Sequence, residues 1–193
     1  MPYGGDVQRR GIYVEIQIRA DLTAVWDATQ QPDQHPRWDV RFSRITPSGA
    51  TGSGASAFTY ERRVPFHTVH GTGVSLGEKD RPDGTCTSAL RFQTDDRLSP
   101  ITQGRGYWRY VPVDAQTTTF ITGYDYTPGW GALDVIVRPL LGWATAWSFD
   151  RLRIWLETGT EPERWPLWST LWWWRGDRPR AARCLRAPRR STA

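Results

Sequence analysis

Few residues of this 193-residue chain have the types and spacing that catalysis or metal binding requires. Its three histidines are His35, in a proline-rich stretch, and His67 and His70, on one predicted strand. Residues three apart on a regular strand point to opposite faces, so His67 and His70 share no metal ion unless a bulge lies between them. We therefore predict no metal site and no cofactor, and we expect His35 to be a surface or capping residue.

Other catalytic signatures are missing as well. No G-x-S-x-G nucleophile turn occurs. Residues 71–77 (GTGVSLG) lack the Lys-Ser/Thr pair of a phosphate-binding loop and do not begin a helix, which indicates a curved strand. Histidine can act as an acid or base near neutral pH, so His70 is the best single candidate for a polar group in a binding site.

The element that would position such a site is a long helix, predicted from about Gly131 to Gly159. Apolar residues recur there at steps of three and four, which predicts one apolar face. Pro139 predicts a kink, or the start of a second helix near that point. Arg151 falls within the apolar stripe, and two interpretations stay open. It is either a snorkelling or ion-paired arginine at the end of the stripe, or a charge that reaches a cavity beneath the helix.

The rest of the chain predicts a sheet for this helix to lie on. Alternating apolar residues predict strands at 12–18, 42–46, 57–64, 68–78, 85–93, 103–113 and 117–126. Asp21 is a suitable N-cap for a short helix over 22–29, a second short helix or turn is expected over 32–39, and 48–55 is expected to be a flexible hairpin loop. Glycines predict a bend or bulge in the strand over 68–78. The predicted order is β-α-α-β6-α, an α+β fold.

Charge is unevenly distributed along the chain. From Thr160 onward there are eight arginines against Glu161, Glu163 and Asp177, which accounts for the whole net charge of +5. Residues 1–159 are formally neutral and give no electrostatic reason for nucleic-acid binding. The basic, aromatic tail is an alternative nucleic-acid site but lacks an aromatic strand platform, so we expect no nucleic-acid partner. The N-terminus has no apolar signal-peptide core, and no run approaches the ~20 apolar residues of a spanning helix. We therefore expect a cytoplasmic location.

The opening of the chain resembles the START/polyketide-cyclase (SRPBCC) superfamily of helix-grip proteins. After the first strand comes ADLTAVWDATQQPDQHPRW, followed by a strand that ends near Ile45. The matching positions are Asp21, Trp26, Pro32, Asp33, Pro36 and Trp38. The hairpin GYWRYVPVDAQTTTFITGYDY and the helix ending DRLRIWLE fit the same plan. The resemblance covers about residues 10–159, so we predict a flexible lead-in at 1–10, a ligand-binding domain at 11–159 and an extension at 160–193.

The resemblance implies a curved antiparallel sheet of about seven strands wrapped around the long helix, with a cavity between them. Such a cavity suits a hydrophobic or amphipathic small molecule, such as a lipid, isoprenoid or polyketide-like compound. The alternatives are a polyketide cyclase/aromatase-like enzyme that uses the same cavity, and a solid core with no cavity. The candidate ligand-binding residues are Tyr60, Arg62, His70, Phe92, Trp108, Arg109, Tyr124, Leu140, Trp147 and Arg151.

The extension at 160–193 holds five of the twelve tryptophans, at positions 165, 168, 172, 173 and 174. In one interpretation, Trp165, Leu167, Trp168, Leu171 and Trp172 dock on the domain, and the arginine-rich end is disordered. In the other, the tryptophans lie in a lipid interface and the arginines meet anionic head groups. The second interpretation predicts an interaction module that places the protein at the periphery of a membrane.

Overall fold

The computed structural model describes residues 11–50 and 55–188, and its helices and strands follow the predicted order. The strands are β1 (Ile12–Ile18), β2 (Arg44–Ala50), β3 (Ser56–Val64), β4 (His67–Asp80), β5 (Cys86–Gln93), β6 (Ile101–Asp114) and β7 (Thr117–Pro128). The helices are α1 (Leu22–Gln30), α2 (His35–Trp38) and α3 (Asp134–Thr158). Short 3-10 helices are η1 (Gly131–Leu133), η2 (Pro162–Arg164), η3 (Leu167–Leu171) and η4 (Ala181–Arg183).

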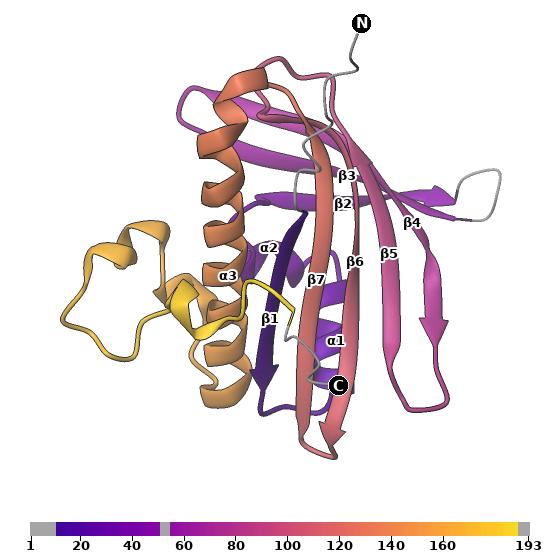
Figure 1. Ribbon diagram of the computed structural model, residues 1–193, viewed down its shortest axis with the longest axis vertical. Coiled ribbons are helices and arrows are strands. Elements are labelled where there is room, and N and C mark those ends of the chain that lie inside the picture. Colours follow the sequence, from indigo (N-terminus) through magenta and orange to yellow (C-terminus); the bar gives the residue numbers. More distant parts are fainter. Residues whose placement is uncertain (1–10, 51–54, 189–193) are drawn as a thin grey trace, which may run out of the picture.

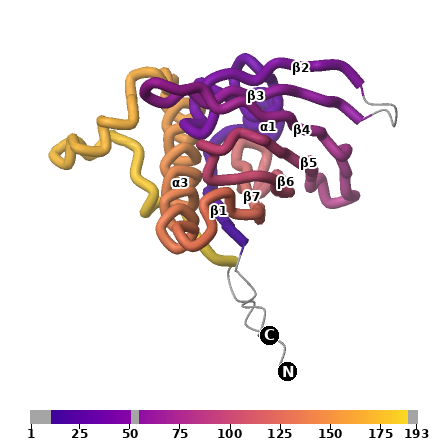
Figure 2. Tube along the Cα trace, turned by 90° about the horizontal axis from the view of Figure 1, so that it is seen from above, coloured from indigo at the N-terminus to yellow at the C-terminus, as the bar shows by residue number. Residues whose placement is uncertain are grey.

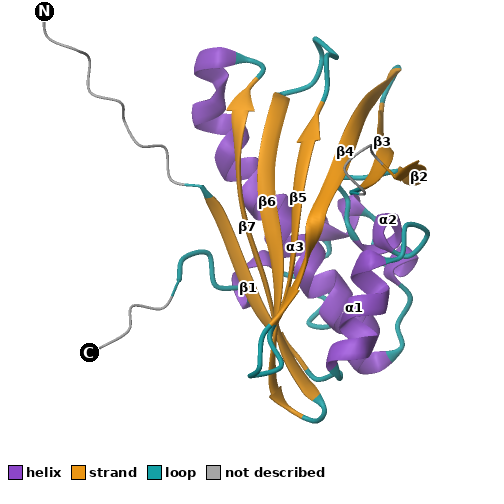
Figure 3. Cartoon of the chain, turned by 90° about the vertical axis from the view of Figure 1, so that its right-hand side faces the viewer, coloured by secondary structure: helices purple, strands orange, loops and turns teal. Residues whose placement is uncertain are grey.

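The seven strands form one antiparallel sheet in the order β1-β7-β6-β5-β4-β3-β2. The sheet bends from β1 round to β2, and α3 stands at its open side (Figures 1 and 2). Seen from the side, α1 and α2 lie with α3 on the same face of the sheet (Figure 3). This is the predicted helix-grip α+β architecture.

Of the two effects expected from Pro139, a kink or a second helix, the second helix does not occur. Pro139 lies inside α3, which continues from Asp134 to Thr158, so no second helix begins there. A proline removes one backbone hydrogen bond, and the residues beyond it keep the helix in place by burying one face. The helix ends at Gly159, whose φ of 69° is the left-handed conformation that glycine favours after a helix.

Two sheet predictions have different outcomes. The predicted bulge in β4 is confirmed: the pairing with β5 shifts between Ser75 and Gly77, and Gly77 has a φ of 116°. The prediction of a loop from residue 48 was wrong, because β2 continues to Ala50 and stays paired with β3 beyond a register shift between Pro47 and Gly49. Backbone pairing with β3 outweighs the glycine-rich composition of this stretch. The remaining loop residues 51–54, the lead-in 1–10 and the last residues 189–193 lie outside the described residues.

One end of the concave side is a solid aromatic core. Trp38, Tyr110, Phe120 and Phe149 are fully buried there. The Phe120 ring lies 4.5 Å from the Phe149 ring and 5.1 Å from the Tyr110 ring, measured between centroids. The indole Nε1 of Trp38 donates to the carbonyl of Ala28 at 2.8 Å. Through these contacts Trp38, in the proline-rich corner, joins α1, α2, α3 and the sheet.

The other end of the concave side has aromatic rings laid over glycines. Phe58, Gly73, Phe92, Gly104 and Tyr126 are successive cross-strand neighbours from β3 to β7. A Cβ atom at Gly73 would stand 2.1 Å from the Phe58 ring, and one at Gly104 would stand 2.2 Å from the Phe92 ring. The rings therefore lie flat against the sheet only because glycine is opposite them.

We expect Gly104→Ala to destabilise the protein by about 1–3 kcal/mol, the usual cost of adding a group to a packed site. The new Cβ would meet the Phe92 ring and also the backbone oxygen of Asp125, at 2.8 Å. The ring can turn aside but the backbone oxygen cannot. Urea unfolding would measure the change. Gly176→Ala is the control, because its Cβ would meet nothing within 4 Å; an equal loss in both variants would contradict the prediction.

Candidate functional site

Five of the ten predicted site residues point to the concave side of the sheet: Tyr60, Arg62, Phe92, Trp108 and Tyr124. Their registers place them on the same face as the core residues of β7. Trp108 and Tyr124 are buried, whereas Phe58, Tyr60 and Phe92 are half-buried. We name the last three side chains the aromatic floor.

The aromatic floor continues into the core through ring contacts. The Tyr60 ring covers Gly71, where a Cβ would be 2.2 Å away, and meets Phe42 edge-on at 5.6 Å. Phe42 in turn lies 5.0 Å from the ring of His35. Burial raises the pKa of the Tyr60 hydroxyl to about 12, so this phenol is neutral and can only exchange hydrogen bonds at physiological pH.

Two predicted site residues point away from the concave side. His70 is paired with Glu61 of β3. Tyr60 and Arg62, on either side of Glu61, face inward, so His70 points to the outer face, where it is exposed. Arg109 lies between Trp108 and Tyr110 of the core, so it also points outward, with its guanidinium 5.2 Å from the Tyr107 ring. The prediction that these two residues border the cavity was wrong, because strand alternation turns them outward.

The three candidates on α3 do not join the aromatic floor. Leu140 is 58% exposed, so the predicted apolar stripe is not covered at this position. Trp147 is fully buried, with its ring near Trp143 at 6.5 Å and near the Arg151 guanidinium at 5.5 Å.

Arg151 is neither a snorkelling or ion-paired residue nor a charge that reaches a cavity, the two interpretations that the sequence left open. Its Nε donates to the carbonyl of Pro162 at 2.7 Å, and its Nη1 lies 3.5 Å from the carbonyl of Trp38. Burial lowers the pKa of this guanidinium to about 10, so it stays charged at neutral pH. The residue joins α3 to the α2 corner and to the segment that follows the helix.

A buried charge cluster beside the floor was not predicted. Asp39 is fully buried, and its carboxylate accepts from Arg41 Nη2 at 2.6 Å and lies 3.1 Å from His35 Nε2. Burial alone would raise the pKa of Asp39, but the nearby Arg41 charge and the bonds from Arg41 and His35 hold that pKa well below its usual range. The i, i+4 spacing of His35 and Asp39 was the available signal.

The expectation for His35 was wrong. The ring is 4% exposed, stacks on Trp38 at 4.9 Å and lies 4.7 Å from Trp108. The short helix α2 turns it inward, because positions i and i+3 share one face of a helix.

Arg41 connects this cluster to the wall of the site. Its guanidinium lies 5.3 Å from the Tyr124 ring, and the Tyr124 hydroxyl is 2.9 Å from Thr145 Oγ1 on α3. Arg41 is therefore already occupied by Asp39 and by the Tyr124 ring.

On the concave face, the guanidinium of Arg62 has no bonding partner among the described residues. Its side chain is half-buried, two residues along β3 from Tyr60. Within residues 11–50 and 55–188 it makes no hydrogen bond or ion pair. Burial lowers its pKa, an effect that the charge of Asp39 opposes. A half-buried guanidinium next to aromatic rings can accept an acidic group, which its planar donors fit.

Hollows occur elsewhere on the molecule. One of about 520 Å³ adjoins Tyr13, Tyr107 and Gly123, and another of about 540 Å³ lies between Ile12, Arg138 and Arg186. Neither is lined by Tyr60, Arg62 or Phe92, although Tyr124, another predicted site residue, lines the first. Among the described residues, no group of His, Cys, Asp and Glu could hold a metal ion, and no helix is long and apolar enough to cross a membrane.

Comparison with known sequences gives one informative relative. No family model matches the chain. A protein of Bacillus subtilis (strain 168), named "Uncharacterized membrane protein YndG", is 42% identical over 164 residues. The match covers 82% of this chain and 61% of the relative, so the chain spans about three fifths of that protein's length.

Solved structures resemble the chain in fold. A START superfamily protein from Mycobacterium smegmatis has a TM-score of 0.54 at 12% identity, covering 74% of this chain and 93% of its own. The Zhui aromatase/cyclase from Streptomyces sp. R1128 has a TM-score of 0.54 at 13% identity, covering 79% and 98%. A STAR-related lipid transfer protein from Xanthomonas axonopodis has a TM-score of 0.53 at 17% identity, covering 79% and 96%.

Proposed function

Because the chain has the START/SRPBCC helix-grip fold, we propose that its concave face binds a hydrophobic or amphipathic small molecule. The observation that carries this proposal is the half-buried aromatic floor beside the uncommitted guanidinium of Arg62. The part of each ring that remains exposed gains about 25 cal/mol per Å² when an apolar ligand covers it. A lipid, isoprenoid or polyketide-like molecule supplies such a surface.

The charges on this face favour a ligand with an acidic end. Asp39 and Arg41 neutralise each other at 2.6 Å, whereas Arg62 has no acidic partner among the described residues. An acidic group of the ligand would form charge-assisted hydrogen bonds with Arg62 and would leave the apolar part on the aromatic floor. The names of two fold neighbours, an aromatase/cyclase and a lipid transfer protein, are compatible with ligands of this kind.

Catalysis on the same face, of the polyketide cyclase/aromatase type, is the alternative. The observation that favours it is a pair of phenol groups on this face. Tyr60 donates a hydrogen bond to the Gln93 carbonyl at 3.4 Å, and the Tyr124 hydroxyl lies 2.9 Å from Thr145 Oγ1. In an enzyme, either phenol would exchange this partner for a reacting carbonyl. An enzyme would convert a bound polyketide-like substrate, whereas a binding protein would release it unchanged.

We expect Arg62→Gln to weaken binding of oleate by at least about tenfold, because a charge-assisted hydrogen bond is worth about 1.5–3 kcal/mol. Binding of oleyl alcohol, which has the same chain and no charge, should change less than about twofold. Competition with a fluorescent fatty acid would measure both affinities. Arg91→Gln is the matched control, because this arginine is exposed on the outer face of β5.

The two parts of the proposal can fail separately. Equal effects of Arg62→Gln on oleate and oleyl alcohol would reject the acidic-group contact while leaving apolar binding in place. Ligand binding as a whole would be rejected if the wild-type protein bound neither probe and carried no small molecule in native mass spectrometry.

Contact with a membrane surface through residues 160–193 is a second function that we propose. The specific observation in its favour is a set of large apolar side chains in this segment that point into solvent: Leu167, Trp168, Leu171, Trp173 and Trp174. The Bacillus subtilis relative is named as a membrane protein. Under this proposal the predicted cytoplasmic protein is peripheral to the membrane.

A further inference from the structure

The segment after α3 is anchored to the domain at its beginning. Trp165 is 1% exposed, and the buried Arg151 donates to the carbonyl of Pro162. Arg37 of α2 forms ion pairs with Glu163, at 2.7 Å, and with Glu161. These contacts hold η2 against α2 and α3.

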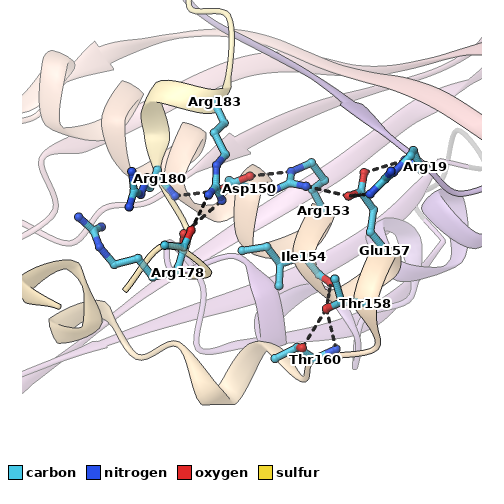
Figure 4. Close-up of polar contacts among 11 residues, drawn as sticks. Arg19, Asp150, Arg153, Ile154, Glu157, Thr158, Thr160, Arg178, Arg180 and Arg183 are labelled. Carbon is cyan, nitrogen blue, oxygen red and sulfur yellow. Dashed lines mark hydrogen bonds and ion pairs between the residues drawn. The ribbon is translucent and has the colours of Figure 1, made fainter. Parts of the chain in front are cut away.

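The same segment is anchored again near its end, by the fully buried carboxylate of Asp150 (Figure 4). Asp150 accepts from the backbone N–H of Arg180 at 2.7 Å and from Arg183 Nη1 at 2.9 Å. It also accepts from Arg153 Nε at 2.7 Å. Further on, Leu185 exchanges two backbone hydrogen bonds of 2.9 Å with Glu15, at the free edge of β1. The segment is thus docked a second time over residues 180–185.

Between the two anchors the chain projects away from α3 as a loop (Figure 1). Three tryptophan rings meet edge-on in this loop. Trp172 lies 6.3 Å from Trp165 and 4.7 Å from Trp168, and the Arg175 guanidinium lies 5.1 Å from the Trp165 ring. The prediction that Leu167, Trp168 and Leu171 dock on the domain was wrong, since each is at least 44% exposed. We name Leu167, Trp168, Leu171, Trp173 and Trp174 the loop tip.

Acidic groups around the loop tip are already paired. Glu161 and Glu163 are bound by Arg37, and Asp177 is bound by Arg175 at 2.7 Å. Arg164 and Arg178 have no acidic partner among the described residues. The tip is therefore apolar, and the carboxylates of the loop are each paired with an arginine, so no unpaired negative charge of the loop would oppose contact with a lipid surface.

We infer that the loop tip inserts its tryptophan and leucine side chains into the interfacial layer of a lipid bilayer, and that this insertion contributes more to binding than the arginines do. The inference rests on the membrane-surface function proposed above and names the residues that carry it. Tryptophan favours the bilayer interface, and exposed apolar area supplies affinity for any lipid composition. Several arginines are meanwhile used in the protein itself, Arg183 on Asp150 and Arg175 on Asp177.

The test is flotation of the full chain with two kinds of vesicle, phosphatidylcholine alone and an equal mixture with phosphatidylglycerol. The tip variant carries Trp168→Ser, Leu171→Ser, Trp173→Ser and Trp174→Ser. The arginine variant carries Arg164→Gln and Arg178→Gln. We expect wild-type protein to float with both vesicles, the tip variant to lose at least about tenfold in affinity for both, and the arginine variant to lose affinity only for the anionic mixture.

Each other outcome overturns a defined part of the inference. No flotation of wild type with either vesicle at low salt rejects the membrane function and the tip together. Flotation of wild type that the tip variant retains rejects the tip alone. A wild-type dimer in light scattering that the tip variant loses, without flotation, assigns the surface to a second copy of the chain. Trp173→Ser alone, at an exposed position, and thermal unfolding of both variants control for misfolding.

Discussion

Asp39→Asn should lower the free energy of unfolding by about 3–5 kcal/mol at neutral pH, the range for removing one partner of a buried ion pair. The Asp39 carboxylate is inaccessible to solvent, and Arg41, whose side chain is 16% exposed, binds it at 2.6 Å. The amide would keep the shape of the side chain but would leave the Arg41 charge without its counter-ion. Urea unfolding followed by tryptophan fluorescence would measure the loss.

The effect of Asp39→Asn should depend on pH in a defined direction. Because its folded-state pKa lies below the unfolded value of about 3.9, Asp39 contributes its full stabilisation above about pH 5 and loses it as the pH falls through the folded pKa. The difference between wild type and variant should therefore shrink between about pH 5 and pH 2. His35 and Arg41 contact this carboxylate directly, and its charge also acts on Arg62 and Arg151.

A matched change at an exposed pair separates burial from charge. Asp177→Asn removes the same charge from a carboxylate that is 57% exposed and bound to Arg175. We expect a loss below about 1 kcal/mol there, as for other surface ion pairs. A loss in Asp39→Asn no larger than in this control would mean that the buried cluster does not stabilise the fold.

Asp150→Ala should cost about 3 kcal/mol, the lower end of the range for a broken buried ion pair, because Arg153 and Arg183 can turn partly into solvent. The larger consequence is local. Without this carboxylate the backbone N–H of Arg180 loses its partner, and the Arg183 guanidinium keeps only the carbonyls of Gly176 and Arg178, which lie in the loop itself, so the second anchor of the loop should open. We expect trypsin to cleave the variant after Arg180 or Arg183 at least about tenfold faster than wild type, since local opening exposes the chain.

The control for Asp150→Ala is Asp125→Ala, which removes a 52% exposed carboxylate that binds Arg138 at 2.7 Å. It should change neither the cleavage rate nor the unfolding midpoint appreciably. If Asp150→Ala unfolded at a lower urea concentration but its cleavage rate below the transition matched wild type, Asp150 would stabilise α3 alone and the second anchor would be refuted.

The elements of this protein and their order were within reach of the sequence alone. Strand alternation as in Ile12–Ile18, the Asp21 N-cap that accepts from the Ala24 N–H at 2.8 Å, and the glycine after α3 are local signals, readable without knowledge of partners. The resemblance of the segment around Trp26 and Trp38 supplied the helix-grip architecture. The aromatic positions of the floor, Tyr60 and Phe92, followed from the same alternation.

Tertiary structure decided which polar groups meet. Whether an alternating residue faces inward depends on the curvature and register of the whole sheet, which is why His70 and Arg109 were expected on the wrong face. His35 and Asp39 were readable as a spacing, but only the packing of α2 beneath Trp108 buries them.

In the extension at 160–193, too, the sequence determined some features and the tertiary structure determined others. Its tryptophans and arginines were evident in the sequence, and so was their affinity for lipid interfaces. A pattern of residues does not say which of them another part of the chain will cover, because burial is a property of two surfaces in contact. The carboxylate of Asp150 and the carbonyl of Pro162 bind the arginines that hold the loop, and they leave Trp173 and Trp174 in solvent.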